Sequence, residues 1–105
     1  MQENQVKIPQ TIYVIMPFSQ TTPERTEDYW TEHFNHFIVQ KINQVIASDE
    51  ILKQFDWTIK RSSVVQGGPL NYEIFWDLLS AQLVIADLTD LNANVLYELG
   101  IRHTF

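Results

Sequence analysis

Two short apolar runs constrain the fold of this chain more than any other feature. Residues 11–18 (TIYVIMPF) and residues 83–86 (LVIA) are almost uninterrupted stretches of β-branched, aliphatic and aromatic side chains. Such runs are typical of strands that are buried on both faces, as in a parallel sheet. Parallel strands need long crossover connections, usually helices. The sequence between the two runs is therefore expected to supply helices that cover a sheet.

The segment after the first run predicts a long amphipathic helix. Thr22 offers an N-cap, and Pro23 then stands at the first helical position. The helix is expected to end near residues 47–49. Its apolar side chains recur at helical spacing and form one stripe: Trp30, Phe34, Phe37, Ile38, Ile42, Val45 and Ile46.

Three further elements follow. Residues 55–63 alternate apolar and polar side chains, which is typical of an edge strand. Residues 71–81 and residues 92–105 have helical character, and Asn92 or Asn94 is the expected cap of the last helix. Gly100, in the middle of that helix, is expected to permit close packing of the helix on the sheet.

The predicted order is β-α-β-α-β-α, which favours an α/β fold with a parallel sheet and right-handed crossovers. The matching architecture is a flavodoxin-like (Rossmann-like) three-layer sandwich with strand order 2-1-3. Residues 1–10 are expected to be a polar lead-in, and residues 11–105 a single domain. Because flavodoxin-like sheets usually have five strands, we expect this domain to be truncated after the third helix.

Composition restricts the classes of function. The 105 residues include seven Lys and Arg against thirteen Asp and Glu, for a net charge of -6, and no cysteine. The acidic balance argues against a nucleic-acid groove, and the lack of cysteine removes thiolate chemistry and disulfides. No stretch approaches the ~20 apolar residues of a membrane span, and the first ten residues are too polar for a signal peptide. We therefore expect a cytoplasmic protein without membrane association.

Neither a metal nor a cofactor is expected. His33 and His36, with Glu32, are spaced like a pair of metal ligands on the first helix, but no third ligand is placed beside them. Residues 66–69 (QGGP) precede a helix, as a phosphate-binding loop would. They lack the lysine and the spacing of a P-loop, so a flexible connection is the favoured interpretation.

Polar side chains gather after the second apolar run. Asp87 and Asp90 follow the predicted strand, Asn92 and Asn94 open the last helix, and Glu98 comes four residues after Asn94, on the same helix face. In strand order 2-1-3 the first and third strands adjoin, and ligands bind in the crevice at their carboxyl ends. The structural alternatives are that the two aspartates form turns, that Asn92 is a cap, and that Glu98 is a solvated helix residue.

The segment LVIADLTDLNANVLYELGIRH (residues 83–103), preceded by YVIMPF on the first strand, resembles the nucleoside 2-deoxyribosyltransferase-like family. That superfamily is structurally akin to the TIR domains, many of which cleave NAD. The predicted layout matches over most of the chain, whereas the motif covers less than a third of it. The resemblance implies a nucleoside, nucleotide or NAD as ligand.

The resemblance also implies residue roles. Glu98 falls on the family's glutamate, which attacks or stabilises the anomeric carbon as the N-glycosidic bond breaks. A family acid near the helix start falls on Asn92, whose amide binds hydroxyls but cannot act as a general acid or base; Asp87 or Asp90 is the expected substitute. We therefore expect Glu98 and Asp87 to be catalytic, and five residues to bind substrate: Pro17, Phe18, Asp90, Asn92 and Asn94.

Two functions follow from these roles. The first is an N-glycosidase or deoxyribosyltransferase-like enzyme, a hydrolase or glycosyltransferase that acts through Glu98. The alternative is a non-catalytic nucleotide-sensing or protein-interaction domain of a signalling or defence protein, which the amide at Asn92 favours. In this superfamily a neighbouring subunit often completes the pocket, and many relatives are fused to other modules. The resemblance therefore implies a homo-oligomer or a part of a longer multidomain protein.

Overall fold

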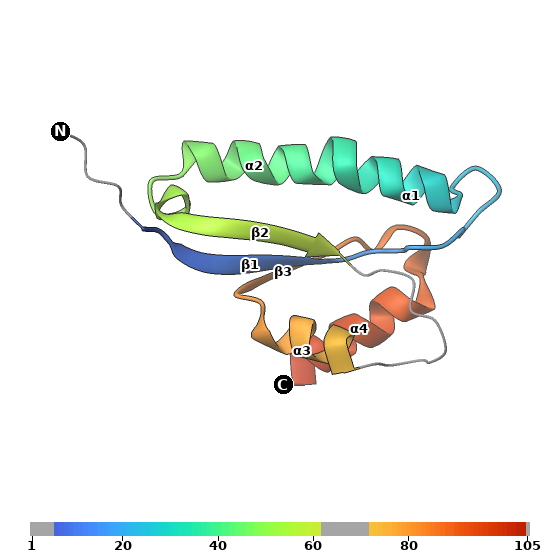
Figure 1. The fold of residues 1–105 in the computed structure, drawn as a ribbon. Helices are drawn as coiled ribbons and strands as arrows, with labels where there is room; N and C mark the ends of the chain where they lie inside the picture. Colours follow the sequence, from blue (N-terminus) through green and yellow to red (C-terminus); the bar gives the residue numbers. More distant parts are fainter. Residues whose placement is uncertain (1–5, 62–71, 105) are drawn as a thin grey trace.

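A three-stranded parallel sheet lies between two layers of helices (Figure 1). The computed structural model describes residues 6–61 and 72–104. The strand order is β2-β1-β3, which confirms the predicted α/β class and the 2-1-3 order. The strands are β1 (Ile8–Ile15), β2 (Phe55–Arg61) and β3 (Leu83–Ala86). The predicted connection at residues 66–69 lies outside the described residues.

The first strand begins earlier than predicted. Ile8 pairs with Phe55 and Gln10 pairs with Trp57, so the end of the predicted lead-in 1–10 is part of the sheet. The sequence signal is weak there because the amino-terminal half of β1 is exposed and mixes apolar with polar side chains. The edge position predicted for β2 is confirmed, and its alternating exposure matches the alternating sequence.

One continuous helix covers one face of the sheet, above β1 and β2 in Figure 1. It begins at Glu27 because Thr26 is the N-cap, and its Oγ1 accepts the Tyr29 N–H at 3.2 Å. The predicted start at Thr22-Pro23 is wrong, since Thr22 Oγ1 accepts the Arg25 N–H at 3.0 Å and closes a separate turn. The helix has three parts: α1 (Glu27–His33), a π-helical segment (Phe34–Ile38) and α2 (Val39–Ser48).

The buried stripe of this helix is narrower than predicted. Phe37 and Val45 are 52% and 57% exposed, so their assignment to the stripe is wrong. Residues four apart drift by about 40° per step around an α-helix of 3.6 residues per turn. The wider π turn, with i→i+5 hydrogen bonds, offsets part of this drift. It thereby keeps one series with four-residue spacing on the sheet: Trp30, Phe34, Ile38, Ile42 and Ile46.

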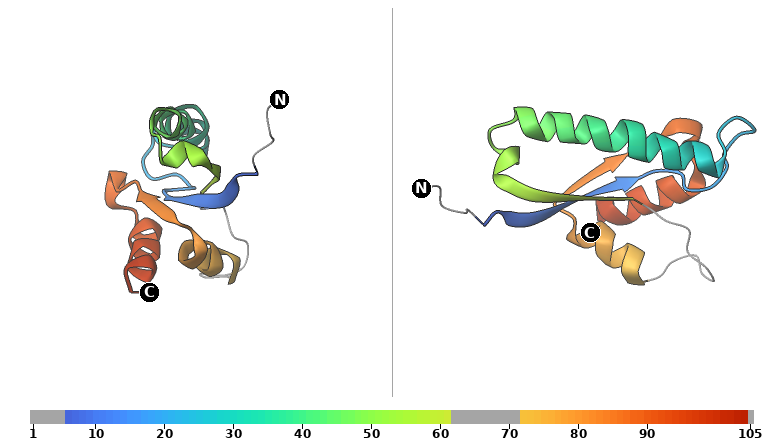
Figure 2. Two further views of the ribbon diagram at one scale, coloured as in Figure 1. Left: turned by 90° about the vertical axis from the view of Figure 1, so that its left-hand side faces the viewer. Right: turned by 45° about the horizontal axis from the view of Figure 1, so that its top comes forward.

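Two further helices, α3 (Tyr72–Ser80) and α4 (Ala93–Thr104), cover the opposite face of the sheet, as both views of Figure 2 show. Arg102 joins α4 to the end of α3, because its Nη1 donates to the carbonyl oxygens of Leu78 and Ala81 at 2.6 and 2.8 Å. The core of this layer consists of Tyr13, Ile15, Leu78, Ala81 and Val95.

Gly100 does not have the packing role predicted for it. The residue is exposed, and apart from its chain neighbours and the backbone of its own helix no atom lies within 4 Å of the position that a Cβ would occupy. The helix contacts the sheet through other residues, among them Val95 and Leu99.

The prediction that residues 83–86 are buried on both faces is wrong. Val84 and Ala86 pack against the core under α3 and α4. Leu83 and Ile85, which point to the other face, are 42% and 41% exposed. The reason is that the single helix on that face packs over β1 and β2, with Trp57 and Ile59 of β2 in its cluster. β3 is left at the margin of the layer.

Candidate functional site

The carboxyl ends of β1 and β3 adjoin, as the strand order requires. The Asp87 N–H donates to the Ile15 carbonyl oxygen at 2.8 Å and extends the pairing one residue beyond β3. The loop after β1 begins at this point with Pro17, whose side chain is buried, and Phe18, which is half-buried. The structure thus brings the predicted Pro17-Phe18 loop beside the predicted Asp87.

Asp87 has two partners at this edge. Its Oδ1 accepts the Thr89 N–H at 2.9 Å, which stabilises a turn directly after the strand. Its Oδ2 lies 3.5 Å from His33 Nε2, on α1. The turn-forming interpretation of Asp87 is therefore correct for one carboxylate oxygen, while the other oxygen faces the His33 imidazole.

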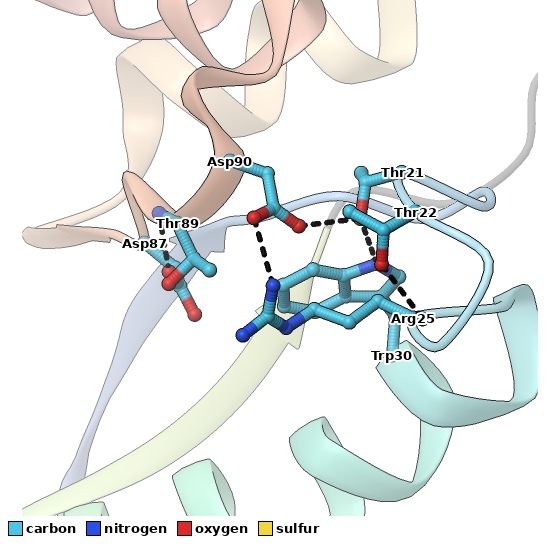
Figure 3. A network of polar contacts seen from close by, with 7 residues as sticks. All are labelled: Thr21, Thr22, Arg25, Trp30, Asp87, Thr89 and Asp90. Atoms are coloured by element: carbon cyan, nitrogen blue, oxygen red, sulfur yellow. Dashed lines mark hydrogen bonds and ion pairs between the residues drawn. The ribbon is translucent and has the colours of Figure 1, made fainter.

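Asp90 joins the same loop to the segment before α1 (Figure 3). One carboxylate oxygen accepts from Arg25 Nη1 at 2.9 Å, and the other accepts from the Thr21 hydroxyl at 2.7 Å. Thr21 Oγ1 in turn accepts from Trp30 Nε1 at 3.2 Å. Asp90 has a φ of 63°, in the left-handed region that Asp tolerates better than most residues. We call Thr21, Arg25, Trp30 and Asp90 the loop clamp.

Sequence reasoning missed the clamp partners Thr21 and Arg25. Neither stands in a recognisable motif, and both meet Asp90 only because the strand order brings two distant loops together. The pKa of Arg25 is raised above its ordinary value, first by a side-chain hydrogen bond with Tyr29 and then by the charge of Asp90. The guanidinium also lies 5.9 Å from the centre of the Tyr29 ring.

A second cation stands at the end of β2, on the same edge of the sheet. Arg61 Nη2 donates to Thr31 Oγ1 at 3.0 Å, and its guanidinium lies over the Phe34 ring at 5.3 Å. Burial lowers the pKa of Arg61, while the charge of Glu27 acts in the opposite direction. Sequence analysis did not single out Arg61.

Asn92 is the N-cap of α4, as one of the structural alternatives predicted. Its Oδ1 accepts the backbone N–H groups of Asn94 and Val95 at 3.0 and 3.3 Å. Asn94 is exposed, whereas Glu98 is buried, so the two side chains do not share an environment although they stand four residues apart.

Glu98 lies in the layer between β1 and α4 with 5% of its surface exposed, so the alternative of a solvated helix position is wrong. Among the residues whose burial the structure describes, Glu98 is the one charged residue that is buried. The Tyr13 hydroxyl donates to Glu98 Oε2 at 3.3 Å. The neighbouring side chains of the same core are apolar, among them Val95 and Leu99.

Glu98 and the two aspartates therefore lie on different sides of the sheet. Asp87 and Asp90 contact residues in and before α1, while Glu98 contacts Tyr13 on the α4 side. Glu98 is about 9 Å along the axis from the cap Asn92, at 1.5 Å per residue. Helix side chains lean toward the helix N-terminus, so Glu98 leans toward the carboxyl edge of the sheet.

The histidines do not form a metal centre with their neighbours. His36 Nε2 lies 3.0 Å from the exposed Glu32, and His33 is directed to Asp87. Within residues 6–61 and 72–104, no group of three His, Asp or Glu side chains is placed to hold a metal ion. Over the same residues, no helix has the length and apolar character needed to cross a membrane.

Comparison of the chain with protein-family models, with curated proteins and with solved structures gives no match.

Proposed function

We propose that the chain is a flavodoxin-like domain of the nucleoside 2-deoxyribosyltransferase-like kind. In this proposal it binds a nucleoside, nucleotide or NAD at the carboxyl ends of β1 and β3, and it cleaves or transfers the N-glycosidic bond. The observation that carries the proposal is the buried carboxylate of Glu98, held by the Tyr13 hydroxyl at 3.3 Å.

A buried carboxylate calls for an explanation other than stability. Moving a carboxylate out of water costs several kcal/mol even after relaxation, on the order of what a whole core side chain contributes. Ionisable groups in such surroundings are concentrated at functional sites. The phenol of Tyr13 orients the carboxylate, as a preorganised nucleophile requires.

The chemistry follows from the carboxylate. As the C1–N bond breaks, its electron pair leaves with the base, and the sugar carbon becomes oxocarbenium-like. Glu98 then forms an ester with C1 or offsets its positive charge. Water, or a second base in transfer, attacks C1 and returns Glu98 to its carboxylate. Asp87 is the group proposed to exchange protons with the leaving base and the attacking water, with His33 Nε2 3.5 Å from its Oδ2.

A specific observation favours the second candidate, a non-catalytic nucleotide-binding or interaction domain. Both oxygens of Asp90 accept hydrogen bonds from the clamp, and Asn92 Oδ1 caps α4. Two of the proposed substrate-binding groups therefore already have structural partners. In this alternative the edge of the sheet binds a ligand, and no bond is broken.

The test is base release by the intact 105-residue chain. Wild-type chain and the Glu98→Gln variant are incubated with NAD and with a panel of ribo- and deoxyribonucleosides, and free base is measured by chromatography. The expected result is release by the wild type and a loss of at least about a hundredfold in Glu98→Gln. Glu32→Gln, an exposed substitution of the same kind on α1, is the matched control and should retain full release.

The other outcomes decide between the candidates. Equal release by the wild type and Glu98→Gln would exclude Glu98 as the reacting group. Calorimetric binding of one of these ligands without release of base, at high protein concentration, would establish the non-catalytic alternative. Absence of both binding and release would contradict the nucleotide-site proposal altogether.

A further inference from the structure

An apolar groove runs beside β3 on the face covered by α2, away from the carboxyl edge. Its volume is about 210 Å³. Ile12 of β1 forms its floor, and the side chains of α2 and β3 form its two walls. The residues that matter for the argument are Ile42 and Val45 on α2, and Leu83 and Ile85 on β3.

The strand β3 presents an open backbone edge. The Asp87 N–H donates to the Ile15 carbonyl oxygen at 2.8 Å, in keeping with the register that pairs Ile15 with Ala86, and alternate residues of a parallel strand bond to the same neighbour. Leu83 and Ile85 therefore direct their N–H and C=O groups to β1, and those of Val84 and Ala86 point away from it. Within the described residues, β3 pairs with β1 alone.

The groove has one charged residue in its lining, Lys41 on α2. Its ammonium lies 5.9 Å from the centre of the Phe37 ring, and within residues 6–61 and 72–104 it takes part in no ion pair. A partner that fills this groove would therefore match it best with two apolar side chains and a carboxylate.

A second copy of the chain fits this surface poorly. The exposed parts of Val45, Leu83 and Ile85 from two copies amount to only a few hundred Å², against at least about 1,200 Å² in specific, stable interfaces. Each copy also carries a net charge of -6, so two copies repel one another. An isolated strand avoids both difficulties, because main-chain hydrogen bonds supply much of the affinity in strand addition.

We propose that the outer edge of β3 and its groove bind an extended segment of another protein as a fourth strand. The segment would place apolar side chains at alternate positions over Leu83 and Ile85, and a carboxylate beside Lys41. This surface lies apart from the carboxyl-edge site, so the proposal does not depend on the proposed enzymatic function.

The experiment uses the full chain and the acetylated, amidated peptide TVTVTET, which places two valines and the glutamate on one face. Amide hydrogen exchange is followed by NMR with and without peptide. We expect exchange at Val84 and Ala86 to slow at least about tenfold at saturation, because these amides gain hydrogen-bond acceptors. Ile85 serves as the internal control, since its amide already faces β1 and should change little.

Two peptide controls separate the contributions. The same peptide with the amides of residues 2–6 N-methylated loses the donors of both edges and should give no protection. The peptide with lysine in place of glutamate should bind a few-fold more weakly, in keeping with a single surface ion pair. Equal binding by the N-methylated peptide would overturn the strand-addition geometry.

Variants of the chain complete the test. Ile85→Lys should abolish peptide binding, and Val6→Lys, the same kind of change at an exposed residue outside the groove lining, should leave it intact. If Ile85→Lys does not fold, as judged by circular dichroism, the N-methylated peptide on the wild-type chain still decides the question. Unchanged exchange at Val84 and Ala86 with TVTVTET would refute the proposal. Protection that rises with chain concentration alone would refute it in favour of a second copy.

Discussion

The two faces of the sheet are packed in different ways. On the α1–α2 face the fully buried residues of the hydrophobic cluster are Ile12, Val14, Met16 and Trp30, and Trp30 is 1% exposed. On the α3–α4 face the core includes the carboxylate of Glu98 against the Tyr13 hydroxyl. Burial of the Glu98 side chain costs stability that an apolar side chain would not. Under the proposed function this cost is accepted because Glu98 is the reacting group.

The largest expected effect tests the apolar face. Trp30→Ala should lower the free energy of unfolding by about 3–5 kcal/mol, because it leaves a large cavity among the buried residues Ile12, Val14 and Met16. Urea denaturation measures the change. Phe37→Ala, on the same helix and half exposed, is the control and should cost less than about 1 kcal/mol. If Trp30→Ala and Phe37→Ala lowered the free energy of unfolding equally, the helix would not pack on the sheet as described.

The next effect tests the polar pair on the opposite face. Tyr13→Phe should cost about 1–2 kcal/mol, because the buried carboxylate of Glu98 loses a donor. Tyr97→Phe, an exposed tyrosine on α4, should change stability by less than about 0.5 kcal/mol. When Glu98→Leu is already present, Tyr13→Phe should change the free energy of unfolding by a different amount than it does in the wild type, since the two residues are in contact. Strict additivity of the two substitutions would argue against the contact.

The smallest expected effect is a gain in stability. Gly100→Ala should raise the free energy of unfolding by about 0.5–1 kcal/mol, because glycine is unfavourable inside a helix and a Cβ at this position meets open space. Thermal denaturation detects the change as a higher Tm. A lower Tm would show that position 100 contacts something after all, as the sequence analysis expected.

The order of strands and helices could be predicted because hydrophobic periodicity is a local property. The i, i+4 series from Trp30 to Ile46 and the alternation around Trp57 survive in the structure. The wrong predictions concern residues whose burial depends on tertiary contacts. Leu83 and Ile85 have the composition of a buried strand, yet exposure depends on how far the helix above them reaches.

The site was predictable to a similar degree. The sequence indicated Asp87 and Glu98 through their place after a buried strand and one turn into a helix. It could not indicate that Glu98 meets Tyr13, or that Asp90 meets Thr21 and Arg25, since these pairs are separated by 85, 69 and 65 residues. Only the packing of the layers brings such partners together.

The most direct test of the central claim measures stability and base release on the same preparation of Glu98→Gln. If Glu98 serves chemistry rather than folding, the free energy of unfolding should stay within about 1 kcal/mol of the wild type, since the glutamine keeps the shape and an acceptor for Tyr13. Release of base from NAD or a nucleoside should fall at least about a hundredfold. Full release by Glu98→Gln, with stability unchanged, would contradict the account.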